Sequence, residues 1–384
     1  MFEYFPDSYS WNLATMSVLN RGGLIGEADD ACRPLLDITD KNSDAAQDAW
    51  LHNWKALAER LQRLAEADLA QGNSLSAGQK FKRAGIYYFI AERMINHRDP
   101  RKIETYLRGE RCYRAGIGHR GDPAEYLDVP FEGKILPAIF VRGRGERPRP
   151  CIVHFNGLDL LKEQIYASVA DDYARRGISV LIVDHPGVGG ALRLGGLVAT
   201  YDTERPAGAC VDYLETRQDV DSKRIGMAAQ SLGGYYSARA ASFEKRFKCC
   251  VVWGAMYDWG ELIEARVKGL GGAPSLPKAL DHSCWVVGAR SPDELVSITK
   301  AMTLEGVIEQ LECHLLVVHG QNDRQVPLQH AYRTFNGAVR AASRELKVFS
   351  LADGGAEHCG ADNNSVVVDY MTDWVAKTLT MQGA

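Results

Sequence analysis

The sequence lacks the long apolar runs and the one-sided charge that mark membrane proteins and nucleic-acid-binding proteins. None of its apolar runs approaches the roughly 20 residues that a membrane-spanning helix needs. The first seven residues, MFEYFPD, have neither the basic region nor the apolar core of a signal peptide. The net charge of −4 gives no electrostatic attraction for nucleic acid. We therefore expect a cytoplasmic protein that binds neither membranes nor nucleic acid.

Patterns typical of disulfides, metal sites and phosphate sites are also missing. The nine cysteines are an odd number without paired spacing, and Cys249 and Cys250 fall in an apolar run, which indicates reduced core residues. No group of cysteines and histidines has the spacing of metal ligands. The glycine clusters at 186–190 and 269–272 do not end in the Gly-Lys-Ser/Thr of a phosphate loop. We expect no metal and no cofactor.

The N-terminal third is predicted to be helical. The 384 residues exceed the usual size of one hydrophobic core, so two domains are expected. Apolar residues recur at spacings of three and four over 45–71, 76–94 and 100–114, which predicts three helices. Their aromatic face consists of Trp50, Trp54, Phe81, Tyr87 and Tyr88. We expect residues 1–122 to form a helical domain that caps the rest of the chain, with this aromatic face buried against the core, the lid or a second subunit of a homodimer. A separate peptide-binding module is the alternative hypothesis.

Residues 123–384 are predicted to form an α/β domain. Short β-branched runs alternate there with helix-length segments, which predicts a doubly wound, mostly parallel sheet. Several of the runs are apolar almost throughout, as buried parallel strands must be. They are 135–141, 151–155, 178–183, 225–228, 249–253, 315–318 and 346–349. The interval between the fifth and sixth runs is too long for a bare loop, so we expect a helical lid insertion at 256–310.

One segment has the pattern of a nucleophile elbow. From Ile225 to Tyr236 the sequence predicts a strand, a tight turn and a helix, with Ser231 in the turn. Small residues lie two positions before and two positions after Ser231, as the pattern Gly-x-Ser-x-Gly requires where strand and helix nearly touch. Ala229 replaces the first glycine and adds only one methyl group. The alternative hypothesis is that Ser231 merely caps the helix.

A histidine and an acid follow in the order that this fold requires. A serine hydroxyl needs a histidine base, and the base needs an orienting carboxylate. Asp323 comes five residues after the run 315–318, and His358 lies in a glycine-rich loop after the run 346–349. Weaker candidates for these two roles are His319, His330, His282, Asp353 and Glu357. The backbone N–H groups of Leu158, which follows Gly157, and of Leu232 are the candidate oxyanion hole.

At these residues the chain resembles a known branch of the α/β-hydrolase superfamily. The branch contains 2,6-dihydroxypseudooxynicotine hydrolase and, more distantly, the fungal hydrolases that shorten polyketide chains in pigment biosynthesis. The resemblance rests on the helical N-terminal region and on the segments 156–158, 162–163, 184–189, 230–236, 319–323 and 358–359. It implies a triad of Ser231, Asp323 and His358. It also implies cleavage of a carbon–carbon bond next to a ketone, as in several relatives.

Three hypotheses for the function remain. The first is a hydrolase that cleaves a β-diketone or a similar aromatic, ketonic small molecule at a carbon–carbon bond. The second is a carboxylesterase or lactonase with the same residues, and the third is a non-catalytic binding protein. A carbon leaving group benefits from a further acid or an aromatic pocket. The insertion offers Tyr257, Asp258, Trp259, Glu261 and Trp285 for such a pocket, and His154 or His185 are further candidates.

Overall fold

The protein forms two compact units in the computed structural model, which describes residues 2–380. The helical unit comprises residues 2–124 together with 273–282, and the sheet unit comprises 125–272 together with 283–380. The predicted insertion at 256–310 therefore contributes to both units. No helix in residues 2–380 is long and apolar enough to cross a membrane.

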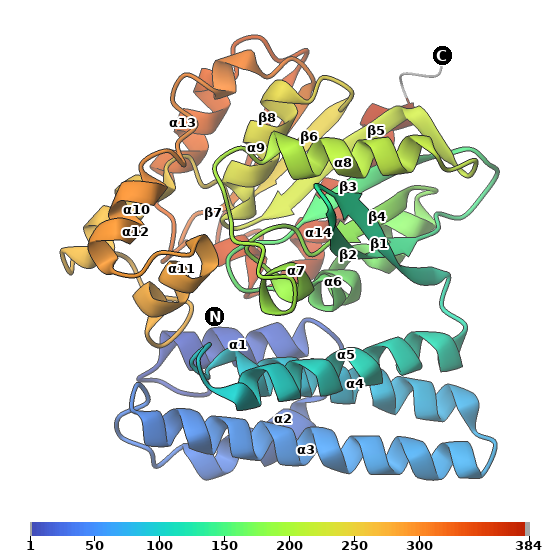
Figure 1. Cartoon of the computed structure of the whole chain (residues 1–384), viewed down its shortest axis with the longest axis vertical. Helices are drawn as coiled ribbons and strands as arrows, with labels where there is room; N and C mark the ends of the chain where they lie inside the picture. The colour runs from blue at the N-terminus through green and yellow to red at the C-terminus, as the bar shows by residue number, and fades with distance from the viewer. Residues whose placement is uncertain (1, 381–384) are drawn as a thin grey trace. The chain divides into compact units, whose positions relative to one another are not determined.

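The helical unit contains the three predicted helices and two that were not predicted. They are α1 (Tyr9–Leu19), α2 (Ile25–Cys32), α3 (Asp44–Ala70), α4 (Ser74–Arg93) and α5 (Pro100–Arg120), with a short 3₁₀ helix η1 (Arg33–Leu35) after α2. Helices α3, α4 and α5 pack side by side (Figure 1). Helix α5 runs six residues beyond its predicted end because Gly121, in the left-handed conformation with φ 65°, provides its C-cap.

The aromatic face predicted for these helices is buried inside the helical unit itself. Trp50, Trp54, Tyr87 and Tyr88 are fully buried, and Phe81 is nearly so. The indole N–H of Trp50 donates to the backbone oxygen of Ile90 at 2.8 Å, which satisfies its polar atom within the core. The aromatic face thus forms the core of this unit, where Trp50 contacts Trp11 and Trp54, and Trp54 contacts Tyr87. The prediction that this face packs against the sheet domain, a lid or a second subunit was wrong.

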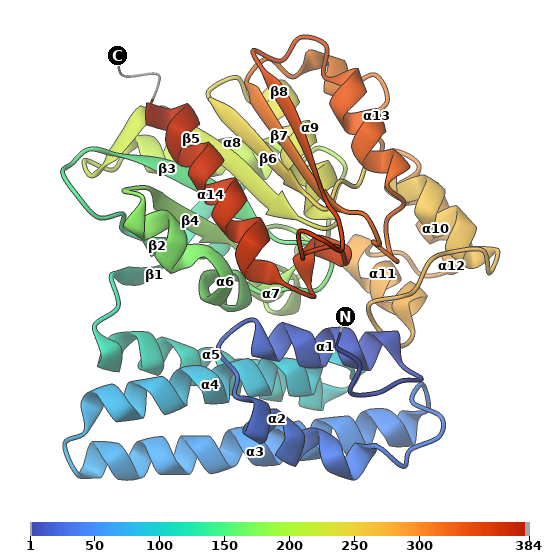
Figure 2. The ribbon, with the colours of Figure 1, turned by 180° about the vertical axis from the view of Figure 1, so that it is seen from behind.

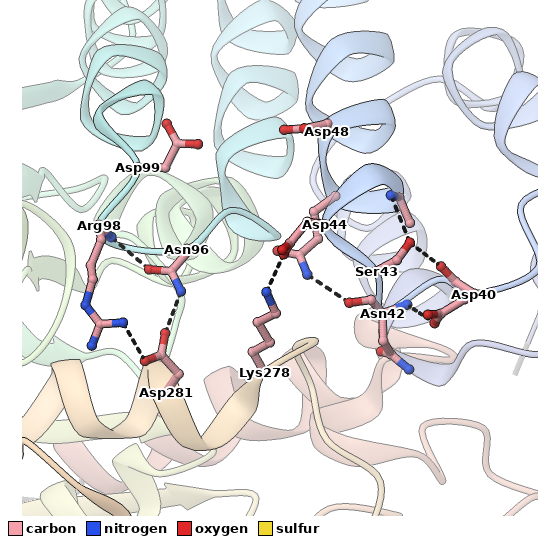
Figure 3. Close-up of polar contacts among 12 residues, drawn as sticks. Asp40, Asn42, Ser43, Asp44, Asp48, Asn96, Arg98, Asp99, Lys278 and Asp281 are labelled. Atoms are coloured by element: carbon pink, nitrogen blue, oxygen red, sulfur yellow. Dashed lines mark hydrogen bonds and ion pairs between the residues drawn. The ribbon is translucent and has the colours of Figure 1, made fainter.

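Residues 273–282 of the insertion pack as part of the helical unit (Figure 3). The side chain of Asn96 donates to Asp281 at 2.7 Å, and Arg98 pairs with the same carboxylate at 3.3 Å. Lys278 forms an ion pair with Asp44 in the first turn of α3. Leu276 is almost fully buried, so an apolar anchor accompanies the polar contacts.

The sheet unit is built on eight strands in the order β1-β2-β4-β3-β5-β6-β7-β8. The strands are β1 (Ala124–Phe131), β2 (Lys134–Val141), β3 (Arg149–Phe155), β4 (Ser179–Val183), β5 (Val220–Gln230), β6 (Cys249–Trp253), β7 (His314–Gly320) and β8 (Arg344–Phe349). All pairs from β4 to β8 are parallel, and β2 runs antiparallel to β4. The predicted mostly parallel sheet is confirmed, whereas β1 was not predicted.

Helices cover both faces of this sheet (Figures 1 and 2). Helices α8 (Glu204–Glu215) and α9 (Gly233–Phe243) lie on one face, and α6 (Lys162–Arg175) and α14 (Asn364–Thr380) lie on the other. The shorter helices α7 (Gly189–Arg193) and α13 (Gln329–Gly337) follow β4 and β7. The insertion consists of α10 (Trp259–Val267), α11 (Ala279–Val287) and α12 (Pro292–Thr299), followed by η2 (Ile308–Gln310), so its predicted helical character is confirmed.

Candidate active site

Ser231 lies in a strained turn between β5 and α9. Its φ is +65°, a value that is costly for a residue with a Cβ atom and is typical of a nucleophile elbow. The Ser231 N–H donates to the backbone oxygen of Trp253 at 2.7 Å. A Cβ atom at Gly233 would lie 2.7 Å from the methyl group of Ala229. The alanine that departs from the usual pattern is therefore accommodated because residue 233 is a glycine.

The structure brings Ser231, His358 and Asp323 into one hydrogen-bonded chain. The Oγ atom of Ser231 lies 2.8 Å from Nε2 of His358, and Nδ1 of His358 lies 2.6 Å from Oδ2 of Asp323. The other carboxylate oxygen of Asp323 accepts the backbone N–H groups of Gln325 and Val326 at 2.8 and 2.9 Å. Because a carboxylate only accepts, Nδ1 of His358 carries the proton and Nε2 faces the serine as an acceptor.

Asp323 and His358 shift each other's pKa. Burial would raise the pKa of the Asp323 carboxyl, but the charge and the hydrogen bond of His358 lower it below its usual value. Burial also opposes a charged His358, yet the Asp323 carboxylate, and to a lesser extent the neighbouring Cys359, outweigh burial and raise the pKa of the imidazole well above its usual value. The carboxylate therefore stabilises an imidazolium, which is what a base needs after it has taken a proton.

The loops that carry Asp323 and His358 are bound to each other. Arg324 pairs with Glu357 through two contacts of 2.9 and 3.1 Å, next to each of the two residues in sequence. A Cβ atom at Gly320 would lie 2.3 Å from the backbone oxygen of Ala356, so this close approach requires glycine. The sequence did not reveal the Arg324–Glu357 pair, since 33 residues separate the partners. Glu357, a weaker candidate for the acid, is engaged in this pair.

The remaining weaker candidates for the acid and the base have partners elsewhere. Asp353 is an exposed carboxylate that accepts from the backbone N–H and hydroxyl of Ser350 and from Lys347. His319 and His330 are almost fully buried, and each accepts a backbone N–H group through Nδ1. These contacts give each of the three a structural role. His282 lies in the helical unit.

The loop after β3 lies against the nucleophile. A Cβ atom at Gly157 would come within 2.9 Å of the Ser231 Cβ atom and 3.5 Å of its Oγ atom. The preceding Asn156 donates through its side chain to Asp184, a fully buried carboxylate that also pairs with Lys162 at 3.1 Å. The loop is thus fixed from behind, and Leu158 and Leu232 directly follow the residues that meet at this point. The Lys162–Asp184 pair is a second feature that sequence reasoning missed.

The two histidines near this loop are buried. Burial lowers the pKa values of His154 and His185 to about 4. Nε2 of His185 lies 3.2 Å from the backbone oxygen of Asn156, and Nδ1 of His154 lies 2.9 Å from that of Phe155. Both contacts are to backbone atoms, which fits support of the loop.

The five residues of the insertion that were predicted to line a substrate pocket contact other protein groups or are buried. Asp258 caps α10 by accepting the N–H of Glu261 at 2.8 Å, and Glu261 pairs with Arg333 at 2.7 Å near the surface. The guanidinium carbon of Arg333 lies 4.1 Å from the ring centre of buried Tyr257. Trp259 is buried, and the half-buried Trp285 stacks with Arg193 of α7 at 5.5 Å. Their role in substrate binding stays a prediction.

Comparisons with protein families and curated proteins place the chain among hydrolases. The profile described as Esterase FrsA-like matches residues 31–260, and that of the Prolyl oligopeptidase family matches residues 207–382. Hydrolase ORFZ of Pyricularia oryzae is 30% identical over 372 residues, which cover 92% of this chain and 80% of the relative. The 2,6-dihydropseudooxynicotine hydrolase of Paenarthrobacter nicotinovorans is 25% identical over 330 residues, which cover 84% of this chain and 84% of the relative.

A solved structure agrees on the fold. The crystal structure of 2,6-dihydroxy-pseudo-oxynicotine hydrolase superposes with a TM-score of 0.77 over 96% of both chains, at 22% identity. The sheet, the profile over more than half of the chain and the relatives lead to one conclusion. The chain belongs to the FrsA-like branch of the α/β hydrolases and is a hydrolase.

Proposed function

We propose that the protein is a cofactor-free serine hydrolase in which Ser231 is the nucleophile, His358 the base and Asp323 the residue that orients His358. The observation that carries the proposal is the chain of contacts from Asp323 through His358 to Ser231, which ends on a strained elbow. Three side chains from loops after β5, β7 and β8 meet there at hydrogen-bond distances, in the order that this fold uses for catalysis.

The proposed reaction has two halves. The Oγ atom of Ser231 attacks the substrate carbonyl while Nε2 of His358 takes the hydroxyl proton. The negative charge on the attacked oxygen is stabilised by the backbone N–H groups of Leu158 and Leu232. His358 then gives its proton to the leaving group, and an acyl group remains on Ser231. Water, deprotonated by His358, hydrolyses this ester and restores the free serine.

The favoured substrate is an aromatic or ketonic small molecule that is cleaved at a carbon–carbon bond next to a ketone. In a β-diketone the second carbonyl stabilises the departing carbanion as an enolate, which His358 can protonate. The sequence resemblance to the pseudooxynicotine and polyketide hydrolases supports this choice. Relatives named 2,6-dihydropseudooxynicotine hydrolase and 20-hydroxy-prefusarin hydrolase are consistent with it.

A carboxylesterase or lactonase is the second candidate. It is favoured by the match of residues 31–260 to a profile described as that of an esterase. An alkoxide leaving group needs one proton, which His358 can supply alone.

The homodimer and the cytoplasmic location also stay predictions. Light scattering of the purified protein tests the homodimer, and cell fractionation tests the location.

Two measurements test the proposal. A fluorophosphonate should label Ser231, and Ser231→Ala should abolish both labelling and turnover while the circular dichroism spectrum is retained. A folded Ser231→Ala protein with wild-type turnover would refute the assignment of the nucleophile. Comparing kcat/KM on aryl β-diketones and on matched aryl esters separates the two substrate classes. Ester turnover that exceeds every diketone by about 10³-fold would refute carbon–carbon cleavage and leave the nucleophile in place.

A further inference from the structure

The base of the insertion lies against Ser231. Residues 254–257 follow β6 directly, and a Cβ atom at Gly254 would come within 3.6 Å of the Ser231 Cα atom and 2.4 Å of the Cys359 sulfur. A Cβ atom at Gly234, in the first turn of α9, would come within 2.8 Å of the Met256 nitrogen. This segment, which we call the insertion base, thus contacts the nucleophile turn and the loop of His358.

The chain enters the insertion through the insertion base, and the returning chain at 302–304 pairs with the residues at and just after it. The backbone of Asp258 forms a β-bridge with Thr303 on the returning chain. The N–H of Trp259 donates to the oxygen of Met302 at 3.0 Å, and the oxygen of Tyr257 accepts from Leu304 at 2.9 Å. The position of residues 254–257 therefore affects both the first residues of the insertion and the returning chain that pairs with them.

Two buried imidazoles hold this segment. The N–H of Ala255 donates to Nδ1 of His319 at 3.1 Å, and the N–H of Tyr257 donates to Nδ1 of His330 at 3.0 Å. Both N–H groups come just after β6 and are buried, so each needs an acceptor that a sheet neighbour would otherwise supply. His319 ends β7 and His330 lies on α13, so the two acceptors come from different elements.

The protonation states fit this role. Because Nδ1 of His319 accepts, its proton lies on Nε2, which faces the backbone oxygen of Val326 at 3.1 Å beside Asp323. Burial lowers the pKa of His319 below its usual value and that of His330 to about 4. Near neutral pH each ring therefore keeps a lone pair on Nδ1 for the backbone N–H.

We propose that His319 and His330 are positioning residues that fix the insertion base beside Ser231 and thereby set the substrate selectivity of the enzyme. The inference rests on the proposed function, because it assumes that Ser231 is the reacting residue. His319 links the insertion base to the loop of Asp323. In contrast, Nδ1 of His330 accepts the backbone N–H of Tyr257 and, at 3.4 Å, that of Asp258. His330 is therefore the residue to change, since its loss leaves the hydrogen bonds of Asp323 in place.

The test uses three variants of His330 in the full-length protein. In His330→Asn the amide oxygen takes the place of Nδ1 and still accepts the N–H of Tyr257. His330→Gln carries its oxygen one bond further out and misplaces it, and His330→Leu has no acceptor. The probes are p-nitrophenyl acetate and p-nitrophenyl octanoate, whose acyl chains differ in length but react by the same chemistry.

The expected result is a graded change in selectivity. The ratio of kcat/KM for the two esters should stay within about 3-fold of wild type in His330→Asn. It should change by about 10-fold or more in His330→Leu, chiefly through KM, with His330→Gln in between. The pair of Asn and Gln variants decides the matter if His330→Leu does not fold. Equal ratios in the Asn and Gln variants, with both folded, would overturn the inference.

Fluorophosphonate labelling separates this inference from the proposed function. Wild-type protein in which Ser231 is not labelled would refute the nucleophile itself. Labelling of Ser231 in wild type and in all folded variants, with a constant ester ratio, would refute only the role of His330.

Discussion

The substitution Gly157→Ala should damage catalysis through a contact of one methyl group. The new Cβ atom would lie 2.7 Å from the backbone oxygen of Gln230 and 2.9 Å from the Ser231 Cβ atom. Ordinary contacts begin near 3.4 Å, so the loop must move by about 0.7 Å, and neither neighbour is the end of a flexible side chain. The φ of Gly157 lies outside the left-handed region, so steric contact is the main effect.

A shift of this size moves the backbone N–H of Leu158 relative to the attacked carbonyl. Misplacing a catalytic group by about 1 Å, or losing one oxyanion donor, costs roughly 10²-fold or more in rate. We expect kcat to fall about 10²-fold with a small change in KM, and the free energy of unfolding to fall by about 1–3 kcal/mol from overpacking.

The assay is p-nitrophenyl acetate hydrolysis together with the rate constant of fluorophosphonate labelling, since both reactions develop charge on an oxygen at this place. The matched control is Gly118→Ala, because a Cβ atom at Gly118 on the exposed side of α5 has nothing within 4 Å. Its activity should match wild type. A folded Gly157→Ala protein with kcat within about 3-fold of wild type would refute the assignment of this loop to the oxyanion hole.

Three further predictions concern the acid, the base and the helical unit. Asp323→Asn should lower kcat by about 10³-fold or more, whereas Asp353→Asn should leave it unchanged; the reverse result would identify Asp353 as the acid. Turnover should be lost as the pH falls through the pKa of His358, because a protonated Nε2 cannot accept the serine proton. The Asp323 carboxylate raises that pKa, so the midpoint of the pH–rate profile should lie above about 6.5 and shift down in Asp323→Asn; a midpoint that does not move would contradict this coupling. The chain without residues 1–122 should aggregate in size-exclusion chromatography, because Leu276 loses the core that buries it; a soluble monomer of wild-type activity would instead indicate an independent helical module.

Local signals explain why most of the sheet and the three site residues could be predicted. The five residues of β6 are all buried, and such a run is readable without knowledge of its neighbours. Ser231 stands between a buried strand and a helix, and Asp323 and His358 each follow a later strand. Fold and chain order together restricted the candidates to these residues.

Features that depend on distant partners could not be predicted. Strand β1 has a single buried residue, Val129, and so lacks the alternation of a strand with one buried face. Helix α1 is buried on several sides and shows no apolar stripe. The acceptors His319 and His330 bind backbone N–H groups more than 60 residues away in the chain, for which no sequence pattern exists.

The assignment of residues 273–282 to the helical unit has an evolutionary consequence. The backbone passes between the units three times, after residues 124, 272 and 282, and not once as in a simple tandem arrangement. Exchange of residues 1–124 alone between two relatives would pair Asn96, Arg98 and Asp44 of one protein with a segment inherited from another. Recombination between relatives just before β1 should therefore give less stable proteins, unless residues 273–282 come from the same parent as the N-terminal helices. We expect the N-terminal helices and residues 273–282 to have diversified together among relatives, although they are separated in the sequence.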